Sequence, residues 1–197
     1  MSEAFPNKID DVVAAYGKGR ISYKEVAIKV PKLYAAGIKG LRIDTVEILA
    51  EEFMDTYFKT RAYHFSKRLV RDAGKLVDLT IAISGSPQEV VSEIGEYLPF
   101  DEIHGSIFTT RDWVYTGTVE RNLILEKTKG VLIDELTRRL LIDFSKSLAF
   151  GDTEQDGAVL RKVGNPIALN PNPSLLKLCS RNHWPWYTEE DPPRLGA

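Results

Sequence analysis

The spacing of apolar side chains changes near residue 62. Before that point apolar residues recur at intervals of three and four, as in Val46, Leu49, Phe53 and Tyr57, which is the period of an amphipathic helix. Beyond it, short apolar runs alternate with helical stretches, and such runs are typical of strands buried in a parallel sheet. The pattern predicts a helical region followed by an α/β region.

Three helices are expected in the first region. Residues 8–16 form a short candidate, and residues 23–36 form a longer one that Pro31 interrupts or kinks. Asp44, followed three residues later by Glu47, resembles a capping box, which predicts that the third helix begins at Asp44.

The second region predicts a doubly wound, mostly parallel sheet, because strands alternate with helices along the chain. The expected strands cover residues 76–83, 147–150 and 167–169, with a β excursion over 103–119 that turns at Gly117. The expected helices cover residues 62–73, a segment opened by Pro87, residues 130–141, a segment beyond Asp156, and residues 173–183. In open α/β sheets ligands bind at the carboxyl ends of the strands, so polar residues at these ends are the candidates for function.

Composition and charge narrow the class of protein. The chain has 26 basic and 28 acidic residues, whereas proteins that bind nucleic acid usually carry a net basic surface. No apolar run approaches the ~20 residues that span a bilayer, and the first residues lack the features of a signal peptide. Cys179 lies in an apolar helical segment, which predicts a buried, inert thiol. We expect a cytoplasmic protein that binds neither nucleic acid nor membranes.

Two aspartates follow the predicted strand 147–150. Asp152 and Asp156 come after Gly151, four residues apart, so the first turn of a helix would place both carboxylates on one side. Carboxylate oxygens near a phosphate suit Mg²⁺, which binds a few carboxylates together with water and substrate oxygens. The alternative is that Asp152 only caps the helix and Asp156 is solvated.

Two further positions suit an anion. Ser84 offers a hydroxyl and neighbouring N–H groups at a strand end that leads into a helix, which is either an anion cradle or an ordinary turn of small residues. Lys129 precedes Gly130 at a predicted helix start, where its charge opposes the helix dipole. A facing phosphate would explain this lysine, and an exposed surface position is the alternative.

In chain order these residues resemble three motifs of the haloacid dehalogenase superfamily, in the branch that contains phosphoserine phosphatase. Ser84-Gly85 resembles the second motif, Lys129-Gly130 the third, and Gly151-Asp152 with Asp156 the fourth. Residues 115–117 and 168–173 resemble connecting segments of the same branch. The resemblance covers about residues 62–187.

The resemblance implies a magnesium-dependent phosphomonoester hydrolase that acts on a small phosphorylated metabolite. It implies a Rossmann-like core over residues 62–187, a helical cap over residues 1–61 and a loose tail over residues 188–197. The residues it assigns to catalysis are Lys129, Asp152 and Asp156. Asp152 would bind Mg²⁺ with Asp156 in support, whereas Ser84, Gly85, Lys129 and Gln155 would bind the substrate.

The first motif of the superfamily has no counterpart in this chain. That motif is Asp-x-Asp-x-Thr or Val at the end of the first strand, and its leading aspartate is the nucleophile. No two aspartates of this sequence are separated by a single residue. We therefore expect an N-terminally truncated phosphatase that lacks the first strand. The alternatives are a non-catalytic phosphate-binding or regulatory relative, and one half of a split enzyme that another chain completes.

Overall fold

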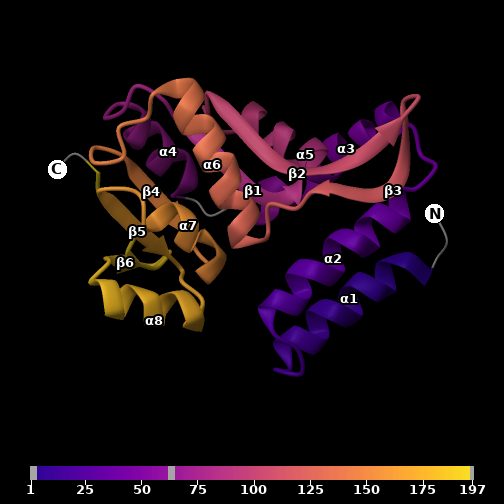
Figure 1. Cartoon of the computed structure of the whole chain (residues 1–197), viewed down its shortest axis with the longest axis horizontal. Helices are drawn as coiled ribbons and strands as arrows, with labels where there is room; N and C mark the ends of the chain where they lie inside the picture. Colours follow the sequence, from indigo (N-terminus) through magenta and orange to yellow (C-terminus); the bar gives the residue numbers. More distant parts are fainter. Residues whose placement is uncertain (1–3, 62–64, 196–197) are drawn as a thin grey trace. The chain divides into compact units, whose positions relative to one another are not determined.

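The computed structural model describes residues 4–61 and 65–195, with side chains for residues 8–56 and 65–195. The chain divides into two compact units built from interleaved parts of the sequence (Figure 1). Unit 1 comprises Met1–Thr60, Ile83–Ile94 and His104–Leu125, and unit 2 comprises Arg61–Ala82, Gly95–Ile103 and Glu126–Ala197. Helices and a parallel sheet are both present, so the predicted α/β class is confirmed.

The N-terminal part of unit 1 is helical, as predicted. Its helices are α1 (Ala4–Gly17), α2 (Tyr23–Ile38) and α3 (Ile43–Arg61). Helix α2 begins with a capping box in which Ser22 and Glu25 each accept the other's backbone N–H, a signal that the sequence analysis missed. Pro31 lies inside α2 and is buried.

The predicted start of α3 is wrong, and among the described residues of the predicted apolar stripe only Val46 is buried. The helix begins at Ile43, so Asp44 lies in its first turn and pairs with the Arg42 guanidinium at 2.9 Å instead of capping the helix. Among the side chains of α3 that the structure describes, those of Val46, Ala50 and Met54 are buried, at intervals of four residues. The predicted stripe members Leu49 and Phe53 are 38% and 46% exposed, and the side chain of Tyr57 lies outside the described residues.

Three strands form one sheet in the order β1-β2-β3. They are β1 (Ile81–Pro87), β2 (Glu102–Arg111) and β3 (Val114–Arg121), of which β2 and β3 are antiparallel. Their hairpin turns at Asp112 and Trp113, with φ values of 52° and 66°, and not at Gly117 as predicted. Gly117 lies inside β3 with φ 89°, where an added Cβ would meet the Lys39 side chain at 2.9 Å.

Strand β1 begins later than predicted and continues through the predicted turn at Ser84. The preceding segment is a loop with Leu76 55% exposed. Thr80 holds this loop in place, because its N–H and its hydroxyl both donate to the Asp101 carboxylate at 2.7 Å. Pro87 precedes the short helix α5 (Gln88–Ser92), which is followed by η1 (Glu93–Glu96).

The core of unit 1 joins the helices to the hairpin. Ala35 and Ile38 of α2 and Val46 of α3 pack with Phe108 of β2 and Tyr115 of β3. Tyr115 also donates a hydrogen bond to the Glu89 carboxylate of α5.

Unit 2 holds the parallel sheet. Its elements are α4 (Ser66–Gly74), α6 (Glu126–Leu140), β4 (Leu148–Gly151), η2 (Glu154–Asp156), α7 (Gly157–Leu160), β5 (Asn165–Leu169), α8 (Pro173–Asn182) and β6 (Trp186–Tyr187). Strands β4, β5 and β6 are adjacent and parallel. Strand β4 belongs to this sheet and β1 to the other, so the strands of the described residues form two three-stranded sheets.

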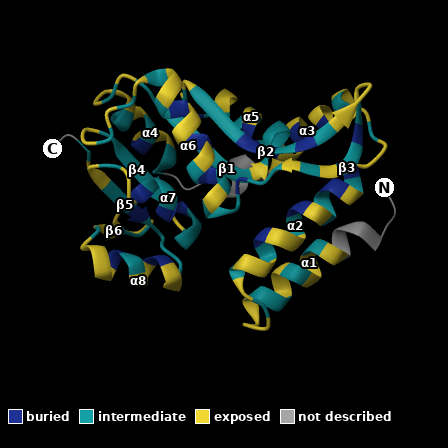
Figure 2. Cartoon of the chain, viewed as in Figure 1, coloured by how far each residue is buried: buried dark blue, intermediate teal, exposed yellow. Residues whose placement is uncertain are grey.

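The core of unit 2 contains the cysteine. Leu160, Ala168, Leu175 and Cys179 pack together, each at most 1% exposed. Figure 2 colours the buried positions of the chain dark blue. The predicted burial of Cys179 is confirmed, and desolvation raises the pKa of its thiol.

The C-terminal segment has contacts with the rest of unit 2. The Glu189 N–H donates to the Asn170 side chain at 2.9 Å, and Pro193 is buried. Within residues 4–61 and 65–195, no helix combines the length and the apolar character that a membrane crossing requires.

Candidate functional site

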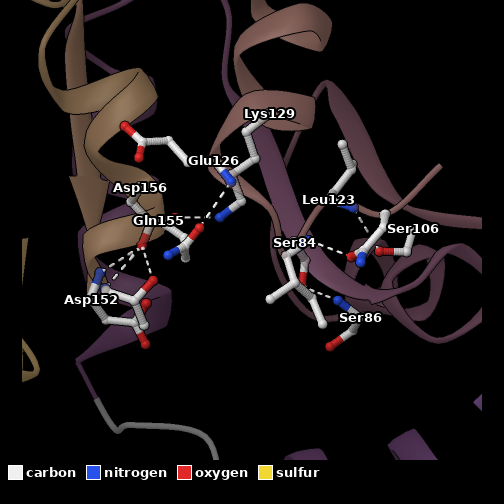
Figure 3. Close-up of polar contacts among 12 residues, drawn as sticks. Ser84, Ser86, Ser106, Leu123, Glu126, Lys129, Asp152, Gln155 and Asp156 are labelled. Atoms are coloured by element: carbon white, nitrogen blue, oxygen red, sulfur yellow. Dashed lines mark hydrogen bonds and ion pairs between the residues drawn. The ribbon is translucent and has the colours of Figure 1, made fainter. Parts of the chain in front are cut away.

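Lys129 is buried in the first turn of α6. The helix begins at Glu126, earlier than the predicted start at Gly130, and only 6% of Lys129 is exposed. Its ammonium is paired with Oδ1 of Asp156, which is 8% exposed (Figure 3). Burying a charge is unfavourable unless it is paired, so each of the two residues explains the burial of the other. The two alternatives, an exposed Lys129 on the surface and a solvated Asp156, are therefore wrong.

Asp156 organises the loop that follows β4. Its Oδ2 accepts the backbone N–H groups of Asp152 at 3.0 Å and Thr153 at 3.1 Å, and it also accepts the Thr153 hydroxyl. Although burial opposes ionisation, the Lys129 ammonium and these N–H groups hold the pKa of Asp156 below its ordinary value. Both oxygens of Asp156 are therefore engaged by the protein itself. Gly151 makes this possible, because an added Cβ would lie 2.6 Å from the Asp156 Cβ.

Asp152 differs from Asp156 in exposure and in ionisation. The residue directly follows β4 and is exposed as a whole. Desolvation of its carboxylate, followed by repulsion from Asp156, raises the pKa of Asp152 to about 6. Its backbone carbonyl accepts the Asn172 N–H at 2.9 Å, which holds the start of the loop against α8. Asp152 therefore presents a carboxylate whose pKa lies closer to neutrality than that of an ordinary aspartate.

The other two polar side chains of the loop bind neighbouring helices. Oε1 of Gln155 accepts the backbone N–H of Glu126 at 3.0 Å, at the start of α6. Oε2 of Glu154 accepts the side-chain amide of Asn172 at 2.7 Å, just before α8. The loop that carries Asp152 is thus tied to helices on both sides.

Ser84 and Gly85 lie in β1, within unit 1. The Ser84 hydroxyl accepts the Ser86 N–H at 3.1 Å, so one N–H of the expected anion cradle bonds to the protein (Figure 3). An added Cβ on Gly85 would lie 2.5 Å from Cγ1 of Ile124 and 3.1 Å from its Cα, so this position requires glycine.

Ser106 supports this strand and was missed in the sequence. It is fully buried in β2, its hydroxyl donates to the Gly85 carbonyl at 2.7 Å, and its oxygen accepts the Leu123 N–H at 3.0 Å. A single serine in a strand carries no motif, so no feature of the sequence distinguishes it from a surface serine.

Four of the six predicted site residues meet in unit 2: Lys129, Asp152, Gln155 and Asp156. The other two, Ser84 and Gly85, belong to unit 1. The convergence of the two sets on one substrate stays a prediction.

The residues suit only part of a magnesium site. Among the described residues, no group of three or more His, Cys, Asp and Glu side chains is arranged to hold a metal ion. Mg²⁺ often takes one or two carboxylates from the protein and fills its octahedron with water and phosphate oxygens. The exposed Asp152 fits one of these protein ligands, whereas Asp156 fits a supporting position.

Curated proteins of similar sequence include phosphatases. The chain is 25% identical to a putative hydrolase of Mycobacterium leprae, over 84% of this chain and 55% of that protein. It is 24% identical to a phosphoserine phosphatase of Mycobacterium tuberculosis, over 76% of this chain and 48% of that protein. It is 27% identical to a histidinol-phosphatase of Neisseria meningitidis, over 71% of this chain and 66% of that protein. The chain thus spans about half the length of most of these relatives, and no family profile matches it.

A solved phosphoserine phosphatase, determined as a phospho-aspartyl intermediate analogue, has the same fold. The TM-score is 0.64 at 19% identity, and the match covers 94% of this chain and 81% of that one. The fold is that of the haloacid dehalogenase phosphoserine phosphatases. The α/β architecture expected from the motif order is therefore confirmed.

Proposed function

We propose that this chain supplies the phosphate- and magnesium-binding part of a phosphatase of the phosphoserine phosphatase type. Its substrate would be a small phosphorylated metabolite. The observation that carries the proposal is the buried Lys129–Asp156 pair beside the exposed Asp152, at the carboxyl end of a parallel strand. Ligands of α/β sheets bind at this end.

These residues match the chemical demands of phosphoryl transfer. Catalysis of this reaction depends mainly on positioning and on neutralising the charge of the phosphoryl oxygens. Lys129 is a compact positive charge whose position the Asp156 carboxylate fixes. Mg²⁺, when bound through Asp152, would neutralise further negative charge on the phosphate. Ser84 and Gly85 are proposed as additional groups near the substrate.

The relatives support the proposed substrate class. Their names include a phosphoserine phosphatase and a histidinol-phosphatase, which share a phosphate ester and differ in the alcohol. We accordingly assign the phosphate ester and leave the alcohol open.

The nucleophile is the element that these residues do not provide. A carboxylate that attacks phosphorus must lie within about 3–3.5 Å of it, and no Asp-x-Asp pair occurs in the chain. Asp156 is engaged by Lys129 and the loop, and Asp152 is assigned to the metal. An upstream segment or a complementing chain would supply the attacking group. The same observation supports a second candidate, a phosphate-binding protein without turnover.

Hydrolysis of an aryl phosphate with and without Mg²⁺ tests the proposal. The chain as given should show essentially no turnover, and the chain joined to an upstream strand ending in Asp-x-Asp-x-Thr should show magnesium-dependent turnover. Asp152→Asn should abolish most of the activity of the extended chain.

Two results would contradict this account in different ways. Robust turnover by the chain as given, lost in Asp152→Asn, would show that another residue serves as the nucleophile. An extended chain that folds and binds phosphate without hydrolysing it would establish the non-catalytic candidate.

A further inference from the structure

We infer that Gln155 is a positioning residue for Lys129, because its side-chain carbonyl caps the helix on which Lys129 lies. The inference rests on the proposed function and deepens it, since it concerns the lysine assigned to phosphate. It also changes the role expected for Gln155, which the family resemblance placed beside the substrate.

Helix α6 needs a cap from outside its own segment. The first N–H groups of any helix have no partner within the helix, and Ser, Thr, Asp or Asn at the preceding position usually supplies one. The residue before α6 is Leu125, whose side chain has no acceptor. The Glu126 N–H bonds instead to Oε1 of Gln155 at 3.0 Å, 29 residues further along the chain.

Gln155 and its neighbour hold two points of one helical turn (Figure 3). Gln155 binds the backbone at Glu126, and Asp156 binds the Lys129 ammonium three residues later in the same turn. A third contact reinforces the turn, because the guanidinium of Arg161, the residue that follows α7, pairs with the Glu126 carboxylate. The position of the Lys129 ammonium therefore depends on the first turn of α6 being closed.

The capping role uses the carbonyl oxygen of Gln155, and this distinguishes it from direct phosphate binding. A phosphate would be bound by the NH₂ group of the amide, because phosphate oxygens accept hydrogen bonds. Supplying α6 with a cap of its own should therefore replace the capping function but not phosphate binding.

Three variants of the full chain separate these roles. Gln155→Leu removes the acceptor at similar size. Leu125→Ser provides a local cap at the residue before the helix, where the serine hydroxyl would accept the N–H of Lys127 or Thr128 and so close the same first turn through a different donor. The double variant combines the two changes. Acetylation of Lys129 by acetic anhydride, mapped by mass spectrometry, reports how well the buried ammonium is held. The exposed Lys127 of the same turn serves as the internal control.

Gln155→Leu should raise the acetylation rate of Lys129 by about fivefold relative to Lys127, the effect expected from removing one helix cap. The double variant should return to within about twofold of Leu125→Ser alone. The inference is overturned if Gln155→Leu leaves the acetylation rate of Lys129 unchanged. It is also overturned if adding Leu125→Ser to Gln155→Leu does not bring that rate back down.

Calorimetric titration with inorganic phosphate in the presence of Mg²⁺ completes the test. Restored phosphate affinity in the double variant supports positioning alone. Restored protection of Lys129 without restored affinity would show that the NH₂ group of Gln155 also binds the phosphate, which overturns the claim that Gln155 acts on phosphate only through Lys129. If the unaltered chain does not bind phosphate, the proposed function fails, whereas the acetylation rates still decide whether Gln155 positions Lys129.

Discussion

Asp152 and Asp156 occupy one short loop, yet their surroundings shift their pKa values in opposite directions. Asp156 lies against the Lys129 ammonium and accepts two backbone N–H groups, which stabilise its charge. Asp152 is partly desolvated and faces the Asp156 charge, and its pKa rises to about 6. An acid whose ionised form is disfavoured by its site is a frequent mark of function. A bound cation would remove that penalty.

Replacing Asp152 by Asn should stabilise the folded chain at neutral pH. The folded pKa of about 6 exceeds the ordinary value of 3.8, so the folded state binds this proton more tightly than the unfolded state. Stability from this group is therefore lost as the pH rises from about 4 to 6. The melting temperature of Asp152→Asn should exceed that of the unaltered chain at pH 7.5, and the difference should vanish below pH 4.

Asp143 provides a control of the opposite sign. Its carboxylate accepts the Ser145 hydroxyl at 2.6 Å and the Ser145 N–H at 3.0 Å, which lower its pKa. Asp143→Asn should therefore lower the melting temperature at pH 7.5. Destabilisation by both variants alike would contradict the assignment of a raised pKa to Asp152.

Magnesium binding should weaken in mild acid. A metal ligand must be deprotonated, so protons compete with Mg²⁺ for Asp152 below its pKa. With the pKa of Asp152 at about 6, the affinity for Mg²⁺ should fall about tenfold per pH unit below 6 and change little above pH 7. Calorimetric titration with Mg²⁺ between pH 5 and pH 8 measures this. An affinity that does not vary over that range would exclude Asp152 as a ligand.

At the scale of elements, two glycines next to predicted site residues differ in what surrounds them. Gly85 follows Ser84 in β1, and an added Cβ would press on the side chain and the Cα of Ile124. Gly130 follows Lys129 inside α6, and an added Cβ would meet only the Cβ of Ala158 at 3.9 Å. The first glycine is required by packing, whereas the second lies in a helix interior, where alanine is preferred.

Alanine should therefore have opposite effects at the two positions. Gly85→Ala should lower the free energy of unfolding by about 1–3 kcal/mol, as overpacking of a core does. Gly130→Ala should raise it by about 0.5–1 kcal/mol, because glycine is unfavourable within a helix. Urea unfolding of both variants measures the difference. A Gly85→Ala variant as stable as the unaltered chain would show that Ile124 moves away without cost.

The existence of most elements could be predicted from the sequence, and their boundaries could not. Each segment predicted as a helix from apolar spacing contains a helix wherever the structure describes it. The hairpin turn was placed at Gly117 because glycine favours turns, whereas the chain turns at Asp112 and Trp113 with left-handed backbone. The start of β1 was missed because it depends on Thr80 bonding to Asp101, a contact between distant residues.

At the scale of the whole molecule, motif order led to the fold and to four site residues that meet. Lys129, Asp152 and Asp156 were selected from local context and Gln155 from the family resemblance, and the structure places the four together in unit 2. The capping bond of Gln155 and the support from Ser106 escaped prediction, since each joins segments far apart in the chain. Hydrogen bonds between such distant segments do not produce a periodic pattern of residue types that a sequence would show.

Binding of inorganic phosphate in the presence of Mg²⁺ tests the central claim most directly. The variant to compare combines Lys129→Met with Asp156→Asn, because removing one partner alone would leave an uncompensated buried charge. Lys127→Met removes an exposed lysine of the same helical turn and serves as the matched control. Thermal unfolding of each protein confirms that it is folded. The account predicts that the unaltered chain and Lys127→Met bind phosphate with the same affinity. The variant that combines Lys129→Met with Asp156→Asn should bind phosphate at least about tenfold more weakly, because it lacks one charge-assisted hydrogen bond to the phosphate. Equal phosphate affinity in the folded double variant would contradict it.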